Sequence, residues 1–393
     1  MACAVLLLAS ACGSDEAEPS SARPADSPSS KASGSASAKP VSEDLAVEPP
    51  GELTQPLLSS DVLVYSQETL EKETVEQIKS IKGVTTVEPI SMGSFFADER
   101  EVTYAAVDPA TFRRFTPPGT AQTAAVWERV AGGEIAIEPK LGRTLQKDDG
   151  YIDLGNGDDA EEVHIGAYAQ ILDPSYARRI DAVVNPRWVD KLGMRRDNAM
   201  IVALDATSPQ SIRKQLQKYA GGSASVQILG PDLDINATQT AFLTGGSVAS
   251  AVGSFSYSAN PDGTVDPDPA WVRANIRTEE MPIIGKVTGH RVMLPQLKAA
   301  LNEVVTRGLG AKIYTYDGLY VPRFIARDPS RGLSFHTYGT AIDLNARDNY
   351  RGIAGKMDRT VVSIFKKWGF AWGGDWNYTD PMHFELAKLV KVG

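Results

Sequence analysis

The chain has 393 residues, more than one ordinary hydrophobic core accommodates, so we expect at least two domains. Its hydrophobic content of 42% and charged content of 23% are those of a globular protein. The formal net charge of -9 argues against nucleic acid as a partner and against general binding to anionic membrane surfaces.

The first residues have the pattern of an export signal. A short apolar stretch, residues 4–9, is followed by small residues and Cys12. Residues 8–13 resemble the lipobox of bacterial lipoproteins, in which the cysteine is lipidated, although the leucine stands one place early. We therefore predict a lipoprotein-type signal over residues 1–12, with Cys12 anchoring the protein to the outer face of the bacterial cytoplasmic membrane. An ordinary secretory signal and an apolar end without this role remain alternatives.

Two further segments lie between the predicted signal and the candidate catalytic residues. Residues 13–53 are rich in Ser, Ala, Pro and acidic residues, which predicts a disordered tether. Residues 54–236 predict an α+β domain with two strand-helix-strand units that share one sheet. The first unit covers residues 61–90 and the second residues 200–229, and the irregular segment between them is expected beside the sheet.

This middle domain weakly resembles the extracytoplasmic domain of MacB/FtsX-type ABC transporter permeases. The resemblance lies in residues 75–84 and 133–137. The transmembrane helices of such permeases are missing, because no run after the N-terminus approaches 18 apolar residues. The resemblance implies at most a sensing or docking module with an envelope protein as partner. A lipid anchor is then the only expected contact with the membrane.

The last two segments are a linker and a second α+β domain. Residues 237–264 are rich in Gly, Ser, Ala and Thr and predict an interdomain linker. Residues 265–393 predict a small α+β domain with two amphipathic helices, at residues 295–307 and 357–368. Leu297, Leu301, Val304 and Val305 are expected to line the core face of the first helix.

Two of the four histidines lie in stretches dense with Gly, Asp and aromatic residues. The first stretch is residues 334–345 and the second residues 372–386. Catalytic zinc needs three protein ligands and an open position for water, and two imidazoles with one carboxylate supply such a set. A turn at Gly339 would bring His336 and Asp343 together, and His383 would come from a second strand. From the residues alone, each histidine is better explained as a structural or surface residue than as a ligand.

Both stretches together resemble the M15 metallopeptidases. The motif Ser-x-His-x-x-Gly-x-Ala-x-Asp is followed about forty residues later by Gly-Gly-Asp-Trp and Asp-x-x-His-Phe-Glu-Leu. The family contains D-alanyl-D-alanine carboxypeptidases and L-alanyl-D-glutamate endopeptidases. The resemblance implies a Zn²⁺-dependent peptidase that acts on peptidoglycan peptides. Which stem-peptide bond is cut stays open, although Asp380 and Phe384 are closer to the endopeptidase branch.

The resemblance also implies a role for each matching residue. His336, Asp343 and His383 match the zinc ligands, and Asp380 matches the general base. Arg323 is a candidate for holding a substrate carboxylate or the developing oxyanion. Three further residues are candidates for supporting the site, of which the last two are also rival bases: Ser334, Asp375 and Glu385.

Two alternative functions stay open, of which the first is not enzymatic. One is a regulatory lipoprotein that binds the cell wall through a peptidase fold without turnover. Another is a lipoprotein in which the middle domain docks on a transporter or on the division machinery, with the peptidase as its effector. The complete set of matching ligands and base, His336, Asp343, His383 and Asp380, favours an enzyme.

Overall fold

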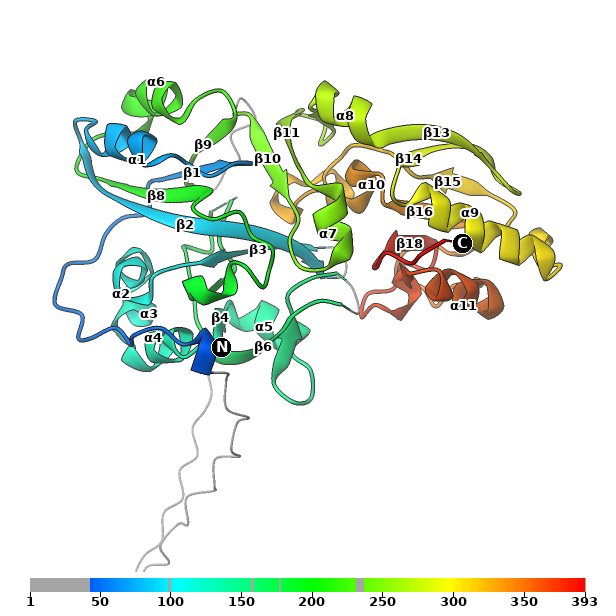
Figure 1. The fold of residues 1–393 in the computed structure, drawn as a ribbon, viewed down its shortest axis with the longest axis horizontal. Helices are drawn as coiled ribbons and strands as arrows, with labels where there is room; N and C mark the ends of the chain where they lie inside the picture. The colour runs from blue at the N-terminus through cyan, green and yellow to red at the C-terminus, as the bar shows by residue number, and fades with distance from the viewer. Residues whose placement is uncertain (1–42, 98–99, 157–158, 177, 231–236, 393) are drawn as a thin grey trace, which may run out of the picture. The chain divides into compact units, whose positions relative to one another are not determined.

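The computed structural model describes residues 43–97, 100–156, 159–176, 178–230 and 237–392 (Figure 1). The predicted signal, Cys12 and most of the predicted tether lie outside the described residues. None of the helices in these ranges combines the length and the hydrophobicity that crossing a bilayer requires. The fold is α+β, as the sequence predicts.

The two predicted strand-helix-strand units do share one sheet. The first consists of β1 (Val62–Ser66), α1 (Lys72–Lys79) and β2 (Val84–Ala97), and the second of β8 (Ala199–Leu204), α6 (Pro209–Ala220) and β9 (Ala224–Ile228). Their strands lie in the order β2-β8-β1-β9 with antiparallel neighbours, which is a split βαβ arrangement. Both helices pack on the same face of the sheet (Figure 1).

The segment between these units extends the sheet instead of packing beside it. Strand β2 is 14 residues long, so its second half pairs with β3 (Arg100–Ala106) beyond the end of β8. Strands β7 (Ala182–Val184), β4 (Ile135–Ile137), β6 (Glu162–Tyr168) and β5 (Tyr151–Asp153) complete a nine-stranded sheet. The helices of this segment are α2 (Pro109–Phe112), α3 (Pro118–Gln122), α4 (Ala124–Ala131) and α5 (Pro139–Leu145). We call residues 43–230 the middle body.

The end of the predicted tether is ordered and belongs to the middle body. Leu45 is buried, and its carbonyl accepts a hydrogen bond from the side-chain amide of Asn185 at 2.8 Å. The backbone N–H of Val47 donates to the carbonyl of Ala131 at 2.8 Å. These tertiary contacts offset the low hydrophobicity that suggested disorder.

The structure also differs from the predicted linker. Residues 237–264 contain β10 (Gln239–Phe242), α7 (Ser247–Val252) and β11 (Ser254–Ala259). The two strands form a small sheet together with β12 (Val265–Pro267). Phe255, Tyr257 and Ala259 alternate inward along β11 and are buried. The small Gly, Ser and Ala residues around them permit close packing, so this composition does not mark a flexible connection here.

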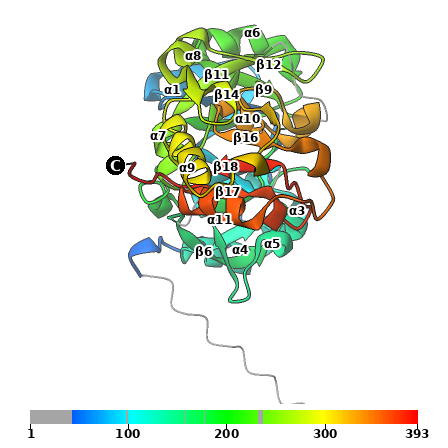
Figure 2. The ribbon, with the colours of Figure 1, turned by 90° about the vertical axis from the view of Figure 1, so that its right-hand side faces the viewer.

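The C-terminal body, residues 265–392, is built around a four-stranded sheet. Its order is β15 (Tyr316–Gly318), β16 (Ala341–Leu344), β18 (His383–Leu386), β17 (Phe370–Trp372). Helices α9 (Leu294–Thr306) and α11 (Arg359–Lys367) correspond to the two predicted helices and cover its outer side (Figure 2). The remaining elements are α8 (Pro269–Asn275), the hairpin β13 (Ile276–Met281) with β14 (Gly285–His290), and α10 (Phe335–Tyr338). Val305 is half-exposed and does not belong to the core face of α9.

The two bodies are not separated by a free linker. All of the described residues belong to one compact unit. Within it, the middle body and the C-terminal body have separate hydrophobic cores, with one exception. Phe96 of β2 is the exception, because it packs into the core of the C-terminal body.

Candidate metal centre

Two antiparallel strands place an aspartate and a histidine side by side. Asp343 in β16 pairs with His383 in β18. Because side chains alternate across a strand, Glu385 shares the face of His383, whereas Phe384 points to the opposite face. On that opposite face, the centroid of the Phe384 ring lies 4.6 Å from that of the Phe365 ring in α11. The strands thus separate a polar face that lines a pocket from an apolar face that packs on the core.

Helix α10 brings His336 to the same point. The hydroxyl of Ser334 caps this helix by accepting a hydrogen bond from the backbone N–H of His336 at 3.4 Å. Gly339 ends the helix with a left-handed φ of 68°, and a Cβ there would lie 2.8 Å from the backbone nitrogen of His290. The chain then turns into β16, which leaves Nε2 of His336 3.2 Å from Oδ2 of Asp343.

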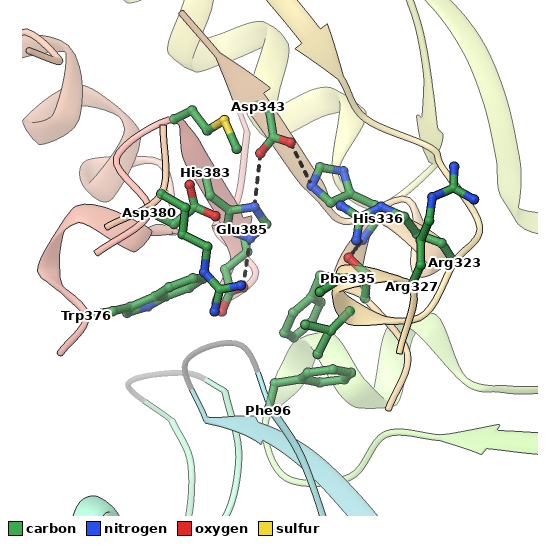
Figure 3. A pocket seen from close by; sticks show the side chains of 15 residues that line it. Phe96, Arg323, Arg327, Phe335, His336, Asp343, Trp376, Asp380, His383 and Glu385 are labelled. Carbon is green, nitrogen blue, oxygen red and sulfur yellow. Dashed lines mark hydrogen bonds and ion pairs between the residues drawn. The ribbon is translucent and has the colours of Figure 1, made fainter. Parts of the chain in front are cut away.

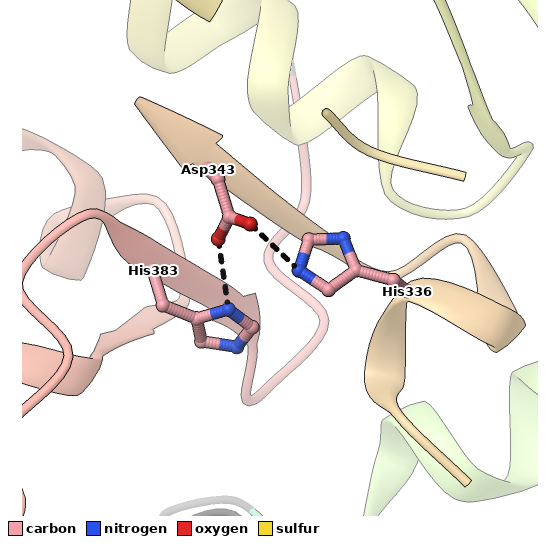
Figure 4. Close-up of side chains that lie close together, drawn as sticks. All are labelled: His336, Asp343 and His383. Carbon is pink, nitrogen blue, oxygen red and sulfur yellow. Dashed lines mark hydrogen bonds and ion pairs between the residues drawn. The ribbon is translucent and has the colours of Figure 1, made fainter. Parts of the chain in front are cut away.

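The side chains of His336, Asp343 and His383 converge in a largely buried position. The Asp343 carboxylate lies between the two imidazoles (Figure 4). One potential ligand atom from each residue lies within 4.8 Å of the other two. Only 2% of the His336 surface is exposed, so its imidazole has little access to bulk water.

The hydrogen bonds of both imidazoles leave lone pairs directed at the Asp343 carboxylate. His336 Nδ1 donates to the carbonyl of Leu319 at 2.8 Å, so Nε2 of the neutral ring carries the lone pair. His383 Nε2 lies 3.1 Å from Oε2 of Glu385, so Nδ1 of the neutral ring faces Asp343, 3.1 Å from its Oδ1. Lone pairs and a carboxylate repel each other unless a proton or cation lies between them. Two imidazole nitrogens and one carboxylate oxygen fit a catalytic zinc site.

The pKa values follow from the same contacts. Burial lowers the pKa of His383, but hydrogen bonds to Asp343 and Glu385 outweigh burial and raise it to about 10. Burial alone would raise the pKa of Asp343, but the facing imidazoles of His336 and His383 hold it well below its usual range. A proton on His383 therefore occupies the position that a metal ion would take, and a metal ion must displace it.

Asp380 adds a second carboxyl group to the pocket. It is 4% exposed, and among the described residues its Oδ1 has no hydrogen-bond partner. Burial raises the pKa of Asp380, and the negative charge of Asp343 adds to this rise, whereas His383 and Arg351 oppose it. Its backbone carbonyl accepts a hydrogen bond from the N–H of His383 at 3.0 Å, which ties the two residues together. A raised pKa makes a carboxylate a stronger base, which suits Asp380 to accept a proton.

The metal centre opens into a pocket of about 350 Å³ (Figure 3). Of the predicted residues, the pocket is lined by Arg323, Ser334, His336, Asp343, Asp380, His383 and Glu385. Sequence reasoning missed Arg351 and Phe96. Trp376 also lines the pocket, with its ring centroid 5.2 Å from that of His383. Burial lowers the pKa of Arg323, and Asp343 opposes this effect.

Residues 327–386 match the M15 peptidase family model that is described as D-alanyl-D-alanine carboxypeptidase. This match supports an M15 peptidase region at the C-terminal end of the chain. M15 peptidases depend on zinc, and the matched stretch contains His336, Asp343 and His383, which together could bind a metal ion. Arg323 and the middle body lie outside the matched residues, so their contribution rests on the structure alone.

Asp375 does not reach the metal centre of this M15 region. Its carboxylate forms an ion pair with Lys366 at 2.5 Å, is half-exposed, and is not among the residues that line the pocket. The two other histidines lie elsewhere as well. His164 contacts Glu134 at 2.6 Å in the middle body, and His290 is buried, with its ring centroid 5.7 Å from that of Trp271.

Proposed function

We propose that the chain is a zinc peptidase of the bacterial envelope that hydrolyses peptide bonds in the stem peptides of peptidoglycan. The observation that carries this proposal is the set of two imidazole nitrogens that face one carboxylate in a pocket with a further carboxyl group of raised pKa. The M15 match over the same residues supports peptides as substrates.

Each polar residue of the pocket has a distinct part in this proposal. His336, Asp343 and His383 would hold zinc, which supplies Lewis acidity and lowers the pKa of a water molecule. Asp380 takes a proton from water and passes it to the leaving amine. Arg323 carries a positive charge into the pocket, where it balances a substrate carboxylate or the negative charge that develops on the carbonyl oxygen.

Digestion of purified muropeptides by the zinc-loaded, full-length protein tests the proposal. Mass spectrometry should show shortened stem peptides, and the mass lost distinguishes a terminal D-alanine from a cut between L-alanine and D-glutamate. Chelation should stop the reaction, and added zinc should restore it. Intact muropeptides after incubation with protein that contains one zinc per chain would refute the proposal.

Glu385 is expected to orient His383 and not to act as the base. Its Oε2 lies 3.1 Å from Nε2 of His383, on the side of the ring away from Asp343. We therefore expect Glu385→Gln to lower zinc affinity about 10-fold to 100-fold, and to regain most activity at high zinc concentration. Titration with a zinc indicator measures the first effect and peptide cleavage the second. Glu280→Gln, which makes the same change at an exposed position of β13, serves as control. A Glu385→Gln variant with normal zinc affinity and no activity would make Glu385 the base.

The cellular location of the protein and the partner of its middle body are inferred from the sequence alone. Export and the Cys12 lipid anchor are inferred from residues 1–12, and an envelope protein as partner of the middle body is inferred from the weak resemblance. These parts of the proposal stay predictions.

A further inference from the structure

The middle body contacts the segment that carries His336 through a pair of residues on neighbouring strands. Phe96 in β2 and Glu101 in β3 are directly paired, so their side chains point to the same face of the sheet. The ring centroid of Phe96 lies 4.3 Å from that of Phe335, the residue before His336 (Figure 3). The side chain of Asn156 fixes the Phe96 backbone, because it accepts a hydrogen bond from the N–H at 2.9 Å and donates one to the carbonyl at 2.6 Å.

Glu101 reaches the backbone just ahead of Ser334 and His336. Its Oε2 accepts a hydrogen bond from the backbone N–H of Leu333 at 3.3 Å. Gly332, with a left-handed φ of 81°, allows the two chains to approach closely, since a Cβ at this position would collide with the Cβ of Glu101. The glutamate side chain therefore packs directly on the start of the segment that carries the metal ligand.

The carboxylate of Glu101 has a fixed position in the middle body. Both Glu101 and Arg178 are buried, and Nη1 of Arg178 lies 3.9 Å from Oε2 of Glu101. A buried carboxylate is costly unless a counter-charge and hydrogen bonds compensate it, and here both come from fixed groups. The guanidinium carbon of Arg178 in turn lies 5.3 Å from the ring centroid of Tyr65 and 5.8 Å from that of Phe242.

The segment that Glu101 contacts also arranges another part of the pocket. The backbone N–H of Ser334 donates to the carbonyl of Arg323 at 3.0 Å. The hydroxyl of Thr337 accepts a hydrogen bond from the N–H of Arg323 and donates one to its carbonyl, both at 2.8 Å. The backbones around Arg323 and His336 thus hold each other, so a displacement at the contact with Glu101 would move both.

We propose that Glu101 is a positioning residue for the metal centre, through which the middle body holds His336 in place for zinc. This inference rests on the proposed function, because it requires that His336, Asp343 and His383 bind zinc. All three ligand atoms must meet at one ion, so the displacement of one of them weakens metal binding. The middle body is then a part of the catalytic site in its own right, with or without a partner protein.

The test compares two variants of the full-length protein that differ only in the hydrogen-bond acceptor at position 101. Both carry Arg178→Met, so that the buried positive charge is removed together with its partner. Glu101→Gln keeps an oxygen that accepts the bond from Leu333, whereas Glu101→Met fills a similar space without such an oxygen. Competition with a zinc indicator should show about 10-fold lower zinc affinity for Glu101→Met than for Glu101→Gln.

A control and a second measurement separate positioning from a general loss of structure. Glu88→Met makes the same change at a buried position of β2, where the carboxylate contacts Thr111, and should leave zinc affinity unchanged. Hydrogen exchange at the Leu333 N–H should be slow in the wild type and in the Glu101→Gln protein, and faster in the Glu101→Met protein. If neither double variant folds, the wild type decides, because exchange of this N–H at the rate of an unstructured chain overturns the inference.

The outcomes distinguish this inference from the proposed function. Equal zinc affinities of the two folded variants overturn the positioning role, even where hydrogen exchange differs, while cleavage of muropeptides by the wild type still upholds the peptidase. If the wild type binds zinc but cleaves no muropeptide, the proposed function fails, and the zinc affinities still decide the role of Glu101. If the wild type binds no zinc, both fail.

Discussion

Replacement of His336 by alanine is expected to remove the bound zinc and, with it, the peptidase activity. The variant loses one of the three ligand residues. It no longer has the imidazole nitrogen Nε2, which in the wild type lies 3.2 Å from Oδ2 of Asp343. Loss of a residue that only orients a ligand costs 10-fold to 100-fold in metal affinity, so loss of a ligand should cost at least about 100-fold. Metal analysis of the purified full-length protein should fall from one zinc per chain to nearly none. His383→Ala should behave in the same way.

A measurement of stability checks that these variants fold. Zinc should raise the unfolding temperature of the wild type, because it binds the folded protein in preference to the unfolded chain. The two variants should unfold cooperatively but show no such rise. His164→Gln is the matched control, since His164 contacts Glu134 in the middle body and does not line the pocket. Normal zinc content in folded His336→Ala or His383→Ala would show that the metal site lies elsewhere.

Asp380→Asn should retain zinc and lose most turnover. Asparagine keeps the shape of the side chain but accepts no proton at neutral pH, and the loss of a general base costs about 100-fold to 10,000-fold in rate. Asp375→Asn is the matched control, because that carboxylate pairs with Lys366 outside the pocket and should be replaced with little effect. Zinc content and muropeptide cleavage, measured on both variants, test the assignment.

The pH dependence of cleavage gives an independent test of Asp380. A general base works only when deprotonated, so activity is lost as the pH falls through its pKa. Burial raises the pKa of Asp380 in the metal-free site and the charge of Asp343 adds to the rise, whereas the charge of a bound zinc ion lowers it, so the test is the presence of an acidic limb and not its position. The residual activity of Asp380→Asn should lack the limb. If the variant cleaves at a normal rate with a normal acidic limb, another residue is the base.

The central residues of the candidate site could be predicted because their recognition depends on residue type and local order. His336, Gly339 and Asp343 lie within eight residues, and the glycine supplies the left-handed turn that brings the other two together. The two strand-helix-strand units were predictable for a similar reason, since apolar periodicity and turn residues delimit each element. The order β2-β8-β1-β9 of the strands of these units depends on pairing between segments far apart in the sequence, so only the structure shows it.

The other features of the pocket could not be predicted, because they depend on contacts between residues far apart in the sequence. Phe96 reaches the pocket only because β2 continues past the end of β8, and its apolar side chain carries no signal for a site. Arg351 follows no motif and enters the pocket through the fold of its loop. Asp375 is a candidate through the Gly-Gly-Asp-Trp motif, but the structure turns its carboxylate toward Lys366. Proximity along the chain therefore did not predict proximity in space.

The folded segment before residue 265 determines where this peptidase can be divided. The ring centroid of Phe255 in β11 lies 4.2 Å from that of Trp271 and 5.3 Å from that of Tyr338, in the helix that carries His336. Truncation at residue 265 would strip this aromatic cover and expose apolar faces to water, which favours aggregation. Phe242 of the neighbouring strand β10 packs instead into the core of the middle body. A cut anywhere in the Gly-rich and Ser-rich stretch would therefore uncover one of the two cores, so in protein engineering this stretch cannot serve as a junction.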